Sequence, residues 1–224
     1  MKIYDELEQG SVEWLEARRG IITASEVGLL ITPTGQVAKN ETVRAHMWEL
    51  LAQRTSGYVE PMYISDDMLR GIHDEVLARD LYSEHHAPVK EIGFVTNEIE
   101  GETVGYSPDG FVGDDGLIEI KSRRQKFQIK AIALDEIPKH NKAQMCMGMM
   151  VTGRKWCDYV SYSAGLPMFV KRYFPEPELV EGITEAIGLF SENITPLSLM
   201  YEKNADRFVM TEREEDDFDF GDEA

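Results

Sequence analysis

Apolar residues recur at helical spacing in two long stretches of the chain. The first runs from Asn40 to Gly57, with an asparagine suited to an N-cap before the periodic residues and a glycine after them. The second covers residues 65–86, and its apolar series predicts a buried stripe on one face of the helix. The residues of that stripe are Met68, Leu69, Ile72, Val76 and Leu77. Further patterns predict helices over residues 24–31, 139–151 and 176–191.

Five apolar or alternating runs between turn residues predict β-strands. They cover residues 88–96, 102–107, 116–121, 156–163 and 168–174. This order of helices and strands predicts an α/β fold with a mixed central β-sheet flanked by helices. Because no internal repeat and no linker rich in Pro, Gly or Ser interrupts the chain, we expect one domain over residues 1–211. Residues 212–224 have the acidic composition of a disordered tail.

The predicted strand 116–121 has an unusual polar face. Side chains alternate across a strand, so Glu119 and Lys121 share one face while Ile118 and Ile120 share the other. A strand that is covered on both sides normally consists of apolar residues alone. Either this polar face is solvated, as in a common surface ion pair, or it lines a site.

A turn upstream of this strand favours the second interpretation. The sequence "YSPDG", residues 106–110, would end one strand and bring Asp109 beside the strand that carries Glu119. Two converging carboxylates form an oxygen-lined site suited to Mg²⁺ or Mn²⁺. Such an ion polarises a phosphodiester and activates water, and a neighbouring lysine stabilises the negative charge that develops. Asp109, Glu119 and Lys121 together therefore indicate phosphodiester hydrolysis.

Acidic residues dominate the chain, which has a formal net charge of −18. Residues 212–224 hold eight acidic residues and one arginine, so residues 1–211 still carry a net charge of −11. This balance argues against a protein that binds polyanions through its overall charge. A role on DNA would require a local basic cluster or a bound metal ion. The densest basic cluster is "KSRRQKFQIK", residues 121–130, which begins within the polar strand.

Cysteine content and hydropathy indicate the compartment. Cys146 and Cys157 suit neither a disulfide framework nor a zinc site with C-x-x-C spacing. No run of eighteen apolar residues predicts a membrane span, and the first residues lack the basic and apolar regions of a secretory signal. We therefore expect a protein of a reducing cytoplasm without a membrane partner.

Four blocks of the sequence together resemble one family of nucleases. Pro108-Asp109 with Glu119-Ile120-Lys121 is similar to the PD-(D/E)xK nuclease pattern, which implies a restriction-endonuclease-like core. Three further blocks resemble the phage lambda exonuclease (YqaJ-type viral recombinase) branch of that superfamily. They are "WLEARRGIITASEV" (residues 14–27), "GIHDEVLAR" (residues 71–79) and "AQMCMGMMVTG" (residues 143–153), in the order of the family.

The resemblance implies catalytic roles for the residues of the motif. Asp109, Glu119 and the backbone carbonyl of Ile120 would bind one or two Mg²⁺ ions, for which Mn²⁺ can substitute. Lys121 would orient or activate the attacking water. Glu75 would complete the metal site, or hold a second ion, from a helix on which it borders the predicted apolar stripe.

The resemblance also implies contacts with the substrate. Arg18 and Ser25 match positions that bind the terminal 5′ phosphate, and Gln144 would contact the substrate or support the attacking water. Arginine offers phosphate a planar bidentate fork, and "TASEV" has the pattern of a helix start with free N–H groups. The basic residues that would contact the DNA backbone are Arg123, Arg124, Lys126 and Lys130.

Two positions depart from the family pattern. Some relatives have His or Tyr where this chain has Asn141, which argues against an assisting role for that position. The exonuclease branch also has an arginine after "TASE", where this chain offers only Thr34, Lys39 and Arg44. This second departure weakens the inference of a complete 5′-phosphate pocket and of 5′ polarity.

The function that the resemblance implies is a metal-dependent, processive exonuclease that degrades one strand of duplex DNA in the 5′→3′ direction. It would leave 3′ single-stranded overhangs for phage-type recombination in the cytoplasm of a bacterial host. A single-strand annealing protein would be its partner, and a ring-shaped homotrimer around DNA its assembly. Two alternatives stay open: a structure-selective or restriction-like PD-(D/E)xK endonuclease, and a DNA-end binding module without activity. Retention of Glu75, Asp109, Glu119 and Lys121 argues against the inactive module.

Overall fold

The structure is a computed structural model that describes residues 1–61 and 64–213. Its helices are α1 (Val12–Arg18), α2 (Val27–Leu30), α3 (Glu41–Ser56), α4 (Asp66–His85), α5 (Gln125–Leu134), α6 (Lys139–Thr152) and α7 (Pro177–Ala205). Its strands are β1 (Lys2–Tyr4), β2 (Ile22–Thr23), β3 (Val89–Lys90), β4 (Phe94–Ile99), β5 (Glu102–Tyr106), β6 (Gly110–Val112), β7 (Gly116–Ser122), β8 (Trp156–Tyr162) and β9 (Phe169–Tyr173). The predicted acidic tail lies almost entirely outside the described residues, so the division at residue 211 stays a prediction.

The strands form two mixed sheets, which confirms the α/β class but divides the single sheet that the sequence suggested. The first sheet has the order β1-β4-β5-β2, with β2 parallel to β5 and the other neighbours antiparallel. The second has the order β3-β6-β7-β8-β9, with only β7 and β8 parallel. The chain passes from the first sheet to the second at residues 107–109, between β5 and β6.

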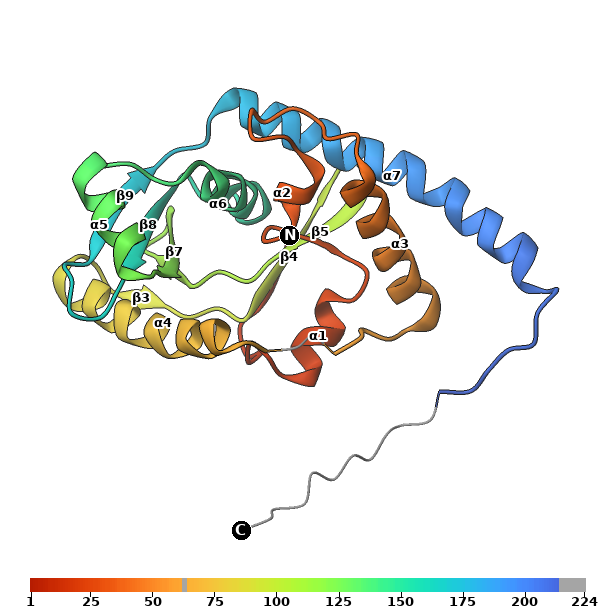
Figure 1. Cartoon of the computed structure of the whole chain (residues 1–224), viewed down its shortest axis with the longest axis horizontal. Coiled ribbons are helices and arrows are strands. Elements are labelled where there is room, and N and C mark those ends of the chain that lie inside the picture. The colour runs from red at the N-terminus through yellow and green to blue at the C-terminus, as the bar shows by residue number, and fades with distance from the viewer. Residues whose placement is uncertain (62–63, 214–224) are drawn as a thin grey trace, which may run out of the picture.

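Strand β7 lies inside the second sheet and is covered on both faces. Parallel neighbours need a long crossover, and here α5 and α6 connect β7 to β8. On one face Leu117 belongs to the large core that includes α6 and α7. On the other face Ile118 and Ile120 pack with Ala78 and other residues of α4 and β8. Figure 1 shows α4 and α6 on opposite sides of the β7–β8 region, with α7 along one edge of the molecule.

The helices with the strongest sequence signals are confirmed. Elsewhere, one helix is longer than predicted and two helices were not predicted at all. The side chain of Asn40 accepts a hydrogen bond from the Val43 N–H at 3.1 Å, and Gly57 ends α3 with a φ of 66°. Helix α6 begins at the predicted residue, but α7 continues to Ala205, past the predicted end at residue 191. Helices α1 and α5 were not predicted. None of the helices in the described segments is both long and apolar enough to cross a bilayer.

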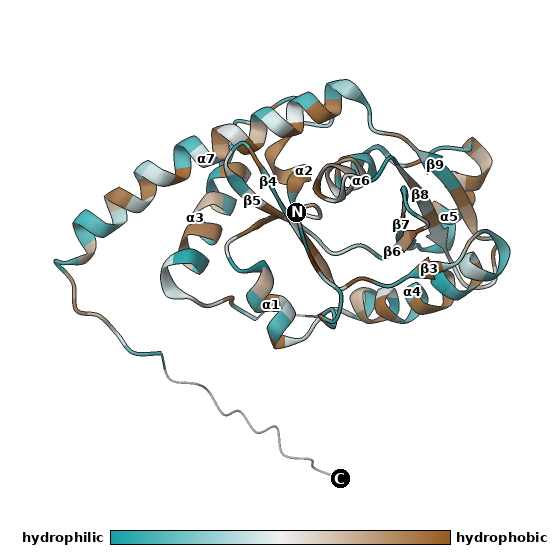
Figure 2. Cartoon of the chain, turned by 180° about the vertical axis from the view of Figure 1, so that it is seen from behind, coloured by the Kyte–Doolittle hydropathy of each residue, from teal (hydrophilic) through white to brown (hydrophobic). Residues whose placement is uncertain are grey.

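The buried stripe predicted for α4 is wrong. Ile72 is 61% exposed and Val76 is 50% exposed, whereas Asp74, Ala78 and Tyr82 are the buried residues of the helix. Helix α4 therefore packs on the sheet through a narrow face made of one small, one aromatic and one acidic side chain. Apolar residues are common on protein surfaces, so their spacing identified the helix but not the face that it buries. Figure 2 shows apolar turns along α4 in brown.

Candidate functional site

The passage between the two sheets places Asp109 against strand β7. Its Oδ2 accepts a hydrogen bond from the Ile120 N–H at 2.5 Å. Pairing of β6 with β7 stops at Gly110 opposite Ile118, which leaves this edge of β7 to the Asp109 side chain. The N–H and C=O of one residue point to the same edge of a strand, so the Ile120 carbonyl faces this edge as well. Gly110, the next residue, has no room for a side chain, because a Cβ there would lie 2.1 Å from Cγ1 of Val89 on β3 and 3.3 Å from Cδ1 of Ile118 on β7.

Glu119 projects from β7 with no exposed surface. Its Oε2 accepts a hydrogen bond from the Tyr106 hydroxyl at 2.8 Å, and Lys121 Nζ lies 2.5 Å from Oε1. The lysine contact is an ion pair without hydrogen-bond geometry, so Oε1 is a buried oxygen without a hydrogen bond among the described residues. Burial and the Glu119 carboxylate raise the pKa of Tyr106, which keeps its hydroxyl a donor. A carboxylate oxygen in this state is suited to a cation.

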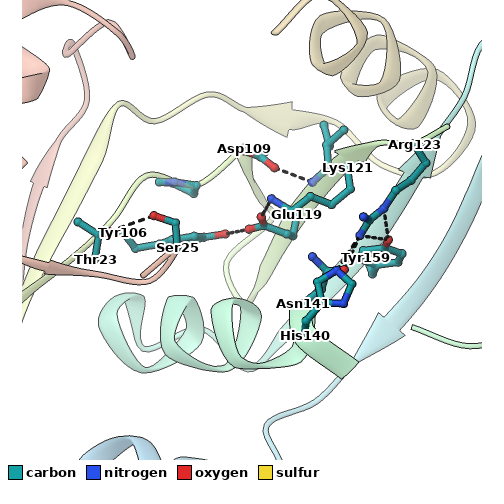
Figure 3. Close-up of polar contacts among 12 residues, drawn as sticks. Thr23, Ser25, Tyr106, Asp109, Glu119, Lys121, Arg123, His140, Asn141 and Tyr159 are labelled. Carbon is teal, nitrogen blue, oxygen red and sulfur yellow. Dashed lines mark hydrogen bonds and ion pairs between the residues drawn. The ribbon is translucent and has the colours of Figure 1, made fainter. Parts of the chain in front are cut away.

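Burial and neighbouring charges shift the pKa values of Asp109, Glu75 and Lys121 at this site. Burial, together with Glu119 and Glu75, raises the pKa of Asp109 well above its ordinary value. Burial also raises the pKa of Glu75, although Arg79 opposes the shift. Burial alone would lower the pKa of Lys121, but Glu119 and Asp109 raise it, so the lysine stays charged. Figure 3 shows Asp109, Glu119 and Lys121 close together. Lys121 pairs with Glu119 and Arg79 with Glu75, which leaves Asp109 without a cationic partner among the described residues, and a divalent cation would supply one.

Glu75 reaches this cluster from α4 but faces Arg79, one helical turn further along. The two side chains form an ion pair, and Arg79 Nε donates to the backbone carbonyl of Asp109 at 2.9 Å. Within residues 1–61 and 64–213, no three His, Cys, Asp or Glu side chains are arranged around one point as metal ligands. Glu75 is therefore linked to Asp109 through Arg79 and does not share a preformed three-carboxylate site with it. The donor types, carboxylate and carbonyl oxygens, nevertheless fit a hard divalent cation.

Arg18 lies at the end of α1 and points to the turn that carries Asp109. Its Nη1 donates to Ser107 Oγ at 3.1 Å, and Trp14 Nε1 donates to the same oxygen at 2.9 Å. The guanidinium also lies over the Trp14 ring, 4.1 Å from the ring centroid. Ser107 stands two residues before Asp109. The predicted phosphate contact and the predicted metal ligand are therefore joined by one short turn.

Hydroxyl groups lie on the other side of the Arg18 guanidinium. Nη2 is 3.4 Å from Thr23 Oγ1, which in turn lies 3.0 Å from Ser25 Oγ. Burial lowers the pKa of Arg18, and Glu26 partly opposes this shift. The polar contacts of Arg18 are thus hydroxyls, and a phosphate would add the charge-assisted hydrogen bonds that arginine favours. Helix α2 begins only at residue 27, so Ser25 precedes the helix start that the sequence suggested.

In the basic segment after β7, one side chain points into the protein and two lie on its surface. Arg123 points toward α6, where its Nη2 donates to Asn141 Oδ1 at 2.5 Å and to the Tyr159 hydroxyl at 3.1 Å. Arg124 has a 64% exposed side chain and pairs with an acidic residue of α4 at 2.8 Å. Lys126 is exposed on α5. The structure therefore brings Arg123 into the body of the protein and leaves Arg124 and Lys126 on the surface.

Helix α6 borders the site on the face of β7 that carries Glu119. Gln144 is half-buried on this helix. Asn141, which stands at the position of the family His or Tyr, instead orients Arg123. Next to it, His140 Nε2 lies 3.4 Å from Arg123 Nη2. A cleft of about 470 Å³ begins at His140, and its lining includes Thr34, Lys139 and Lys142. Glu176, which pairs with Lys142 at 2.6 Å, and Glu178 line the same cleft, so Lys139 is its lysine without an ion pair among the described residues.

Three residues of the site were not predicted from the sequence: Arg79, Tyr106 and Ser107. Arg79 follows Glu75 by four residues on one helix, and this spacing alone could have indicated the ion pair. Tyr106 and Ser107 directly precede the Pro-Asp pair, but their partners are distant in sequence. Only the fold brings these partners to them, so no local signal was available.

Comparison with known proteins identifies the relatives of this site and fold. The family model described as YqaJ-like viral recombinase domain matches residues 13–155. Curated proteins gave no match to the chain. An alkaline exonuclease (LHK-Exo) from Laribacter hongkongensis is 33% identical with a TM-score of 0.78, over 89% of this chain and 100% of that chain. A complex of LHK-Exo with dAMP gives 32% identity and the same coverage and TM-score.

A more distant structure supports the fold alone. The phage related exonuclease from Haemophilus somnus is 14% identical with a TM-score of 0.58, over 80% of this chain and 96% of that chain. The family match covers more than half of the chain and includes all four sequence blocks that suggested the resemblance. The restriction-endonuclease-like core is thereby confirmed. The chain belongs to the YqaJ-like viral recombinase family, and its close structural neighbours are exonucleases.

Proposed function

We propose that the protein is a Mg²⁺-dependent exonuclease that degrades one strand of duplex DNA in the 5′→3′ direction and leaves a 3′ single-stranded overhang. One observation carries the proposal. Asp109, Glu119 and Lys121 lie together at the passage between the sheets, and the Arg18–Ser107 pair lies one turn away. The first group suits hydrolysis of a phosphodiester, and the second suits a terminal phosphate. A hydrolytic site joined to an end-binding site is the arrangement that an exonuclease requires.

The carboxylates of Asp109 and Glu119 and the carbonyl of Ile120 are the residues that would hold the ion. When bound, such an ion polarises the phosphodiester and makes its attacking water more acidic. Tyr106 holds Oε2 of Glu119 through its hydroxyl, which directs the other oxygen of this carboxylate to the site. Mn²⁺ is expected to substitute for Mg²⁺, because both accept oxygen ligands.

Lys121 and two residues from neighbouring helices complete the proposed catalytic group. The Lys121 side chain is 28% exposed and keeps its charge beside Glu119, so it can orient water or stabilise the negative charge of the reacting phosphate. Gln144, which is half-buried on α6, would contact the substrate. Glu75 is the additional acid that α4 supplies.

The 5′ polarity follows from the end-binding residues. Arg18 and Ser25 approach the same threonine hydroxyl, and Arg18 also contacts Ser107, two residues from Asp109. A terminal phosphate held there would place the same phosphodiester at the catalytic group in each cycle, so mononucleotides would be released. The structure of LHK-Exo in complex with dAMP supports this product type. Lys139, which lines the same cleft as Thr34, would take the place of the missing family arginine.

DNA contacts and assembly belong to the same proposal. Arg124 and Lys126 lie on the surface just after β7 and would contact backbone phosphates, while the rest of the surface stays acidic. Arg123 would reach a phosphate only by leaving its contacts with Asn141 and Tyr159. A ring-shaped homotrimer around DNA would account for processive digestion. The 3′ overhang would pass to a single-strand annealing protein in the bacterial cytoplasm, a role that membership in a viral recombinase family supports.

The test uses linear duplex DNA with a 5′ phosphate and covalently closed circular duplex of the same sequence, each incubated with Mg²⁺. We expect a 5′ label to leave the linear duplex at once as a mononucleotide, a 3′ label to stay on a shortening strand, and the circle to survive. Cutting of the circle would favour the endonuclease. Absence of cleavage with Mg²⁺, Mn²⁺ and other divalent ions would favour the inactive DNA-end binding module.

A further inference from the structure

One arginine joins the extra acid of α4 to the backbone of the catalytic turn. The Arg79 side chain is only 12% exposed and has three partners. It pairs with Glu75, donates from Nε to the Asp109 carbonyl at 2.9 Å, and places Nη1 2.7 Å from Glu91 Oε2. Each nitrogen of the guanidinium is thus engaged, and its planar geometry fixes the three partners relative to one another.

The three partners of Arg79 differ in how easily they can leave it. The contact with Asp109 is made by the backbone, so it does not occupy the carboxylate that faces β7. The Glu91 side chain is 73% exposed and belongs to the loop between β3 and β4. The Glu75 side chain is 27% exposed and shares the Arg79 guanidinium with the Asp109 carbonyl, so one side chain separates it from the turn that carries Asp109. Glu75 is therefore the partner for which a cation at the catalytic group would compete.

We propose that Arg79 is a positioning residue that pairs with Glu75 until a divalent cation binds, when Glu75 exchanges Arg79 for the cation. The inference rests on the proposed metal-dependent function. Glu91 keeps the guanidinium paired after the exchange, which avoids an unpaired and largely buried charge. The backbone contact keeps Arg79 in place, so Asp109 is supported both before and after the exchange.

Competition between Arg79 and the cation can be measured without any cleavage. Calorimetric titration of the full chain with Mn²⁺, in the absence of DNA, gives the affinity of the metal site. We expect Arg79→Gln to bind Mn²⁺ about tenfold more tightly, because a unit positive charge that competes for Glu75 is removed. The cleavage rate at saturating Mn²⁺ should fall about tenfold, because the Asp109 backbone loses its support. A residue with a structural role alone would lower affinity, rate and thermal stability together, and that result would overturn the proposal.

A double-mutant cycle isolates the exchange from the general effect of charge. In the Glu75→Gln background, Arg79→Gln should change the Mn²⁺ affinity less than about twofold. An equal effect in both backgrounds would show that Arg79 acts on the site only through its charge, which would overturn the proposal. Lys155→Gln is the matched control, since it removes the same charge from an exposed ion pair with Asp115. It should alter neither the affinity nor the rate.

Two further variants keep the test decisive if Arg79→Gln fails to fold. Glu91→Gln alters an exposed side chain and should weaken Mn²⁺ binding about threefold, because Arg79 then depends more strongly on Glu75. An unchanged affinity would contradict the proposal.

Asp109→Ala separates the inference from the function on which it rests. If that variant retains Mn²⁺ binding and cleavage, the proposed function is wrong. If it loses both while Arg79→Gln binds Mn²⁺ like the unaltered protein, only the exchange is wrong.

Discussion

Strands β7 and β8 are neighbours, and each buries a carboxylate, but the two carboxylates have opposite surroundings. Asp158 on β8 accepts hydrogen bonds from Arg172 at 2.8 and 2.9 Å and from the Tyr82 hydroxyl at 2.7 Å. Glu119 on β7 accepts one hydrogen bond, from Tyr106, and its Oε1 accepts none among the described residues. Asp158 is therefore held by three hydrogen bonds, whereas Glu119 has one hydrogen bond and an ion pair with Lys121.

This difference distinguishes the side of the sheet that stabilises the fold from the side that forms the candidate site. Ile118, not Glu119, is the register partner of Asp158, so the two acids face opposite sides of the sheet. The side of Asp158 is closed by α4 and Arg172, whereas the side of Glu119 meets the passage that carries Asp109. Buried polar groups are normally hydrogen-bonded, and Glu119 Oε1, whose partner among the described residues is the Lys121 ammonium, marks a position that a ligand can complete.

The largest expected effect is the loss of cleavage on removal of the charge beside Glu119. We expect Lys121→Ala to lower the rate of DNA cleavage at least about 10³-fold, because it removes the cation nearest the reacting phosphate. The fold should persist, since the side chain is partly exposed. Cleavage assays and thermal melting of the variant and of Lys155→Ala measure both quantities. An unchanged rate would remove the site assignment.

Asp158, the carboxylate on the other side of the sheet, should affect stability and not cleavage. Asp158→Asn breaks a largely buried ion pair, and we expect it to lower the free energy of unfolding by about 2–4 kcal/mol. The Arg172 side chain is 48% exposed, which places the value toward the lower end. The cleavage rate per folded molecule should not change. Denaturant unfolding and a cleavage assay test the comparison. It breaks down if Asp158→Asn impairs cleavage while leaving the unfolding midpoint in place.

A third test extends the comparison to a cation whose partners are hydroxyls. Arg18→Ala should slow digestion from 5′-phosphorylated ends about tenfold more than from 5′-hydroxyl ends, because a charge-assisted hydrogen bond to phosphate is lost. The matched measurement uses one duplex prepared with either end. Equal slowing of both substrates would refute the end-binding role and leave Arg18 as a support for Ser107.

The unsatisfied site should also make the folded state less stable in the absence of metal. The pKa of Asp109 is raised in the folded protein, so this group favours folding most below pH 4, the ordinary range of Asp. Its contribution is lost as the pH rises from there through the raised folded value. Asp109→Asn should therefore raise stability in EDTA at neutral pH by about 1–2 kcal/mol and flatten its dependence on pH. Mg²⁺ should stabilise the unaltered protein alone; an equal Mg²⁺ effect on both would contradict the assignment.

The sequence allowed the strand that carries Glu119 and Lys121 to be predicted because its signal is local. Glu119 and Lys121 interrupt an apolar run at alternate positions, and this pattern is independent of the rest of the fold. The turn that brings Asp109 to β7 has a local signal as well, and so do the caps of α3. These features need only the chemistry of a few neighbouring residues.

The partners of the site could not be predicted, because they come from distant segments. Tyr106 reaches Glu119 only because β5 and β7 belong to two sheets that meet at residues 107–109. Arg79 reaches the Asp109 carbonyl only because α4 lies against β7. The burial of Asp158 and the exposure of Ile72 likewise depend on which face of α4 packs on the sheet.

The smallest expected effect is the change in stability on substituting an exposed apolar residue of α4, which tests which face of this helix packs on the sheet. Ile72 is 61% exposed, so Ile72→Gln should change the free energy of unfolding by less than about 0.5 kcal/mol. Ala78 has no exposed surface on the same helix, and Ala78→Leu should cost about 1–3 kcal/mol because the core beneath it cannot accept a larger side chain. Denaturant unfolding of the two variants at low and high protein concentration gives both values. A larger loss for Ile72→Gln than for Ala78→Leu would show that the apolar stripe is buried after all. If that loss appeared only at high concentration, the stripe would be covered by another copy of the chain, and α4 would pack through two faces.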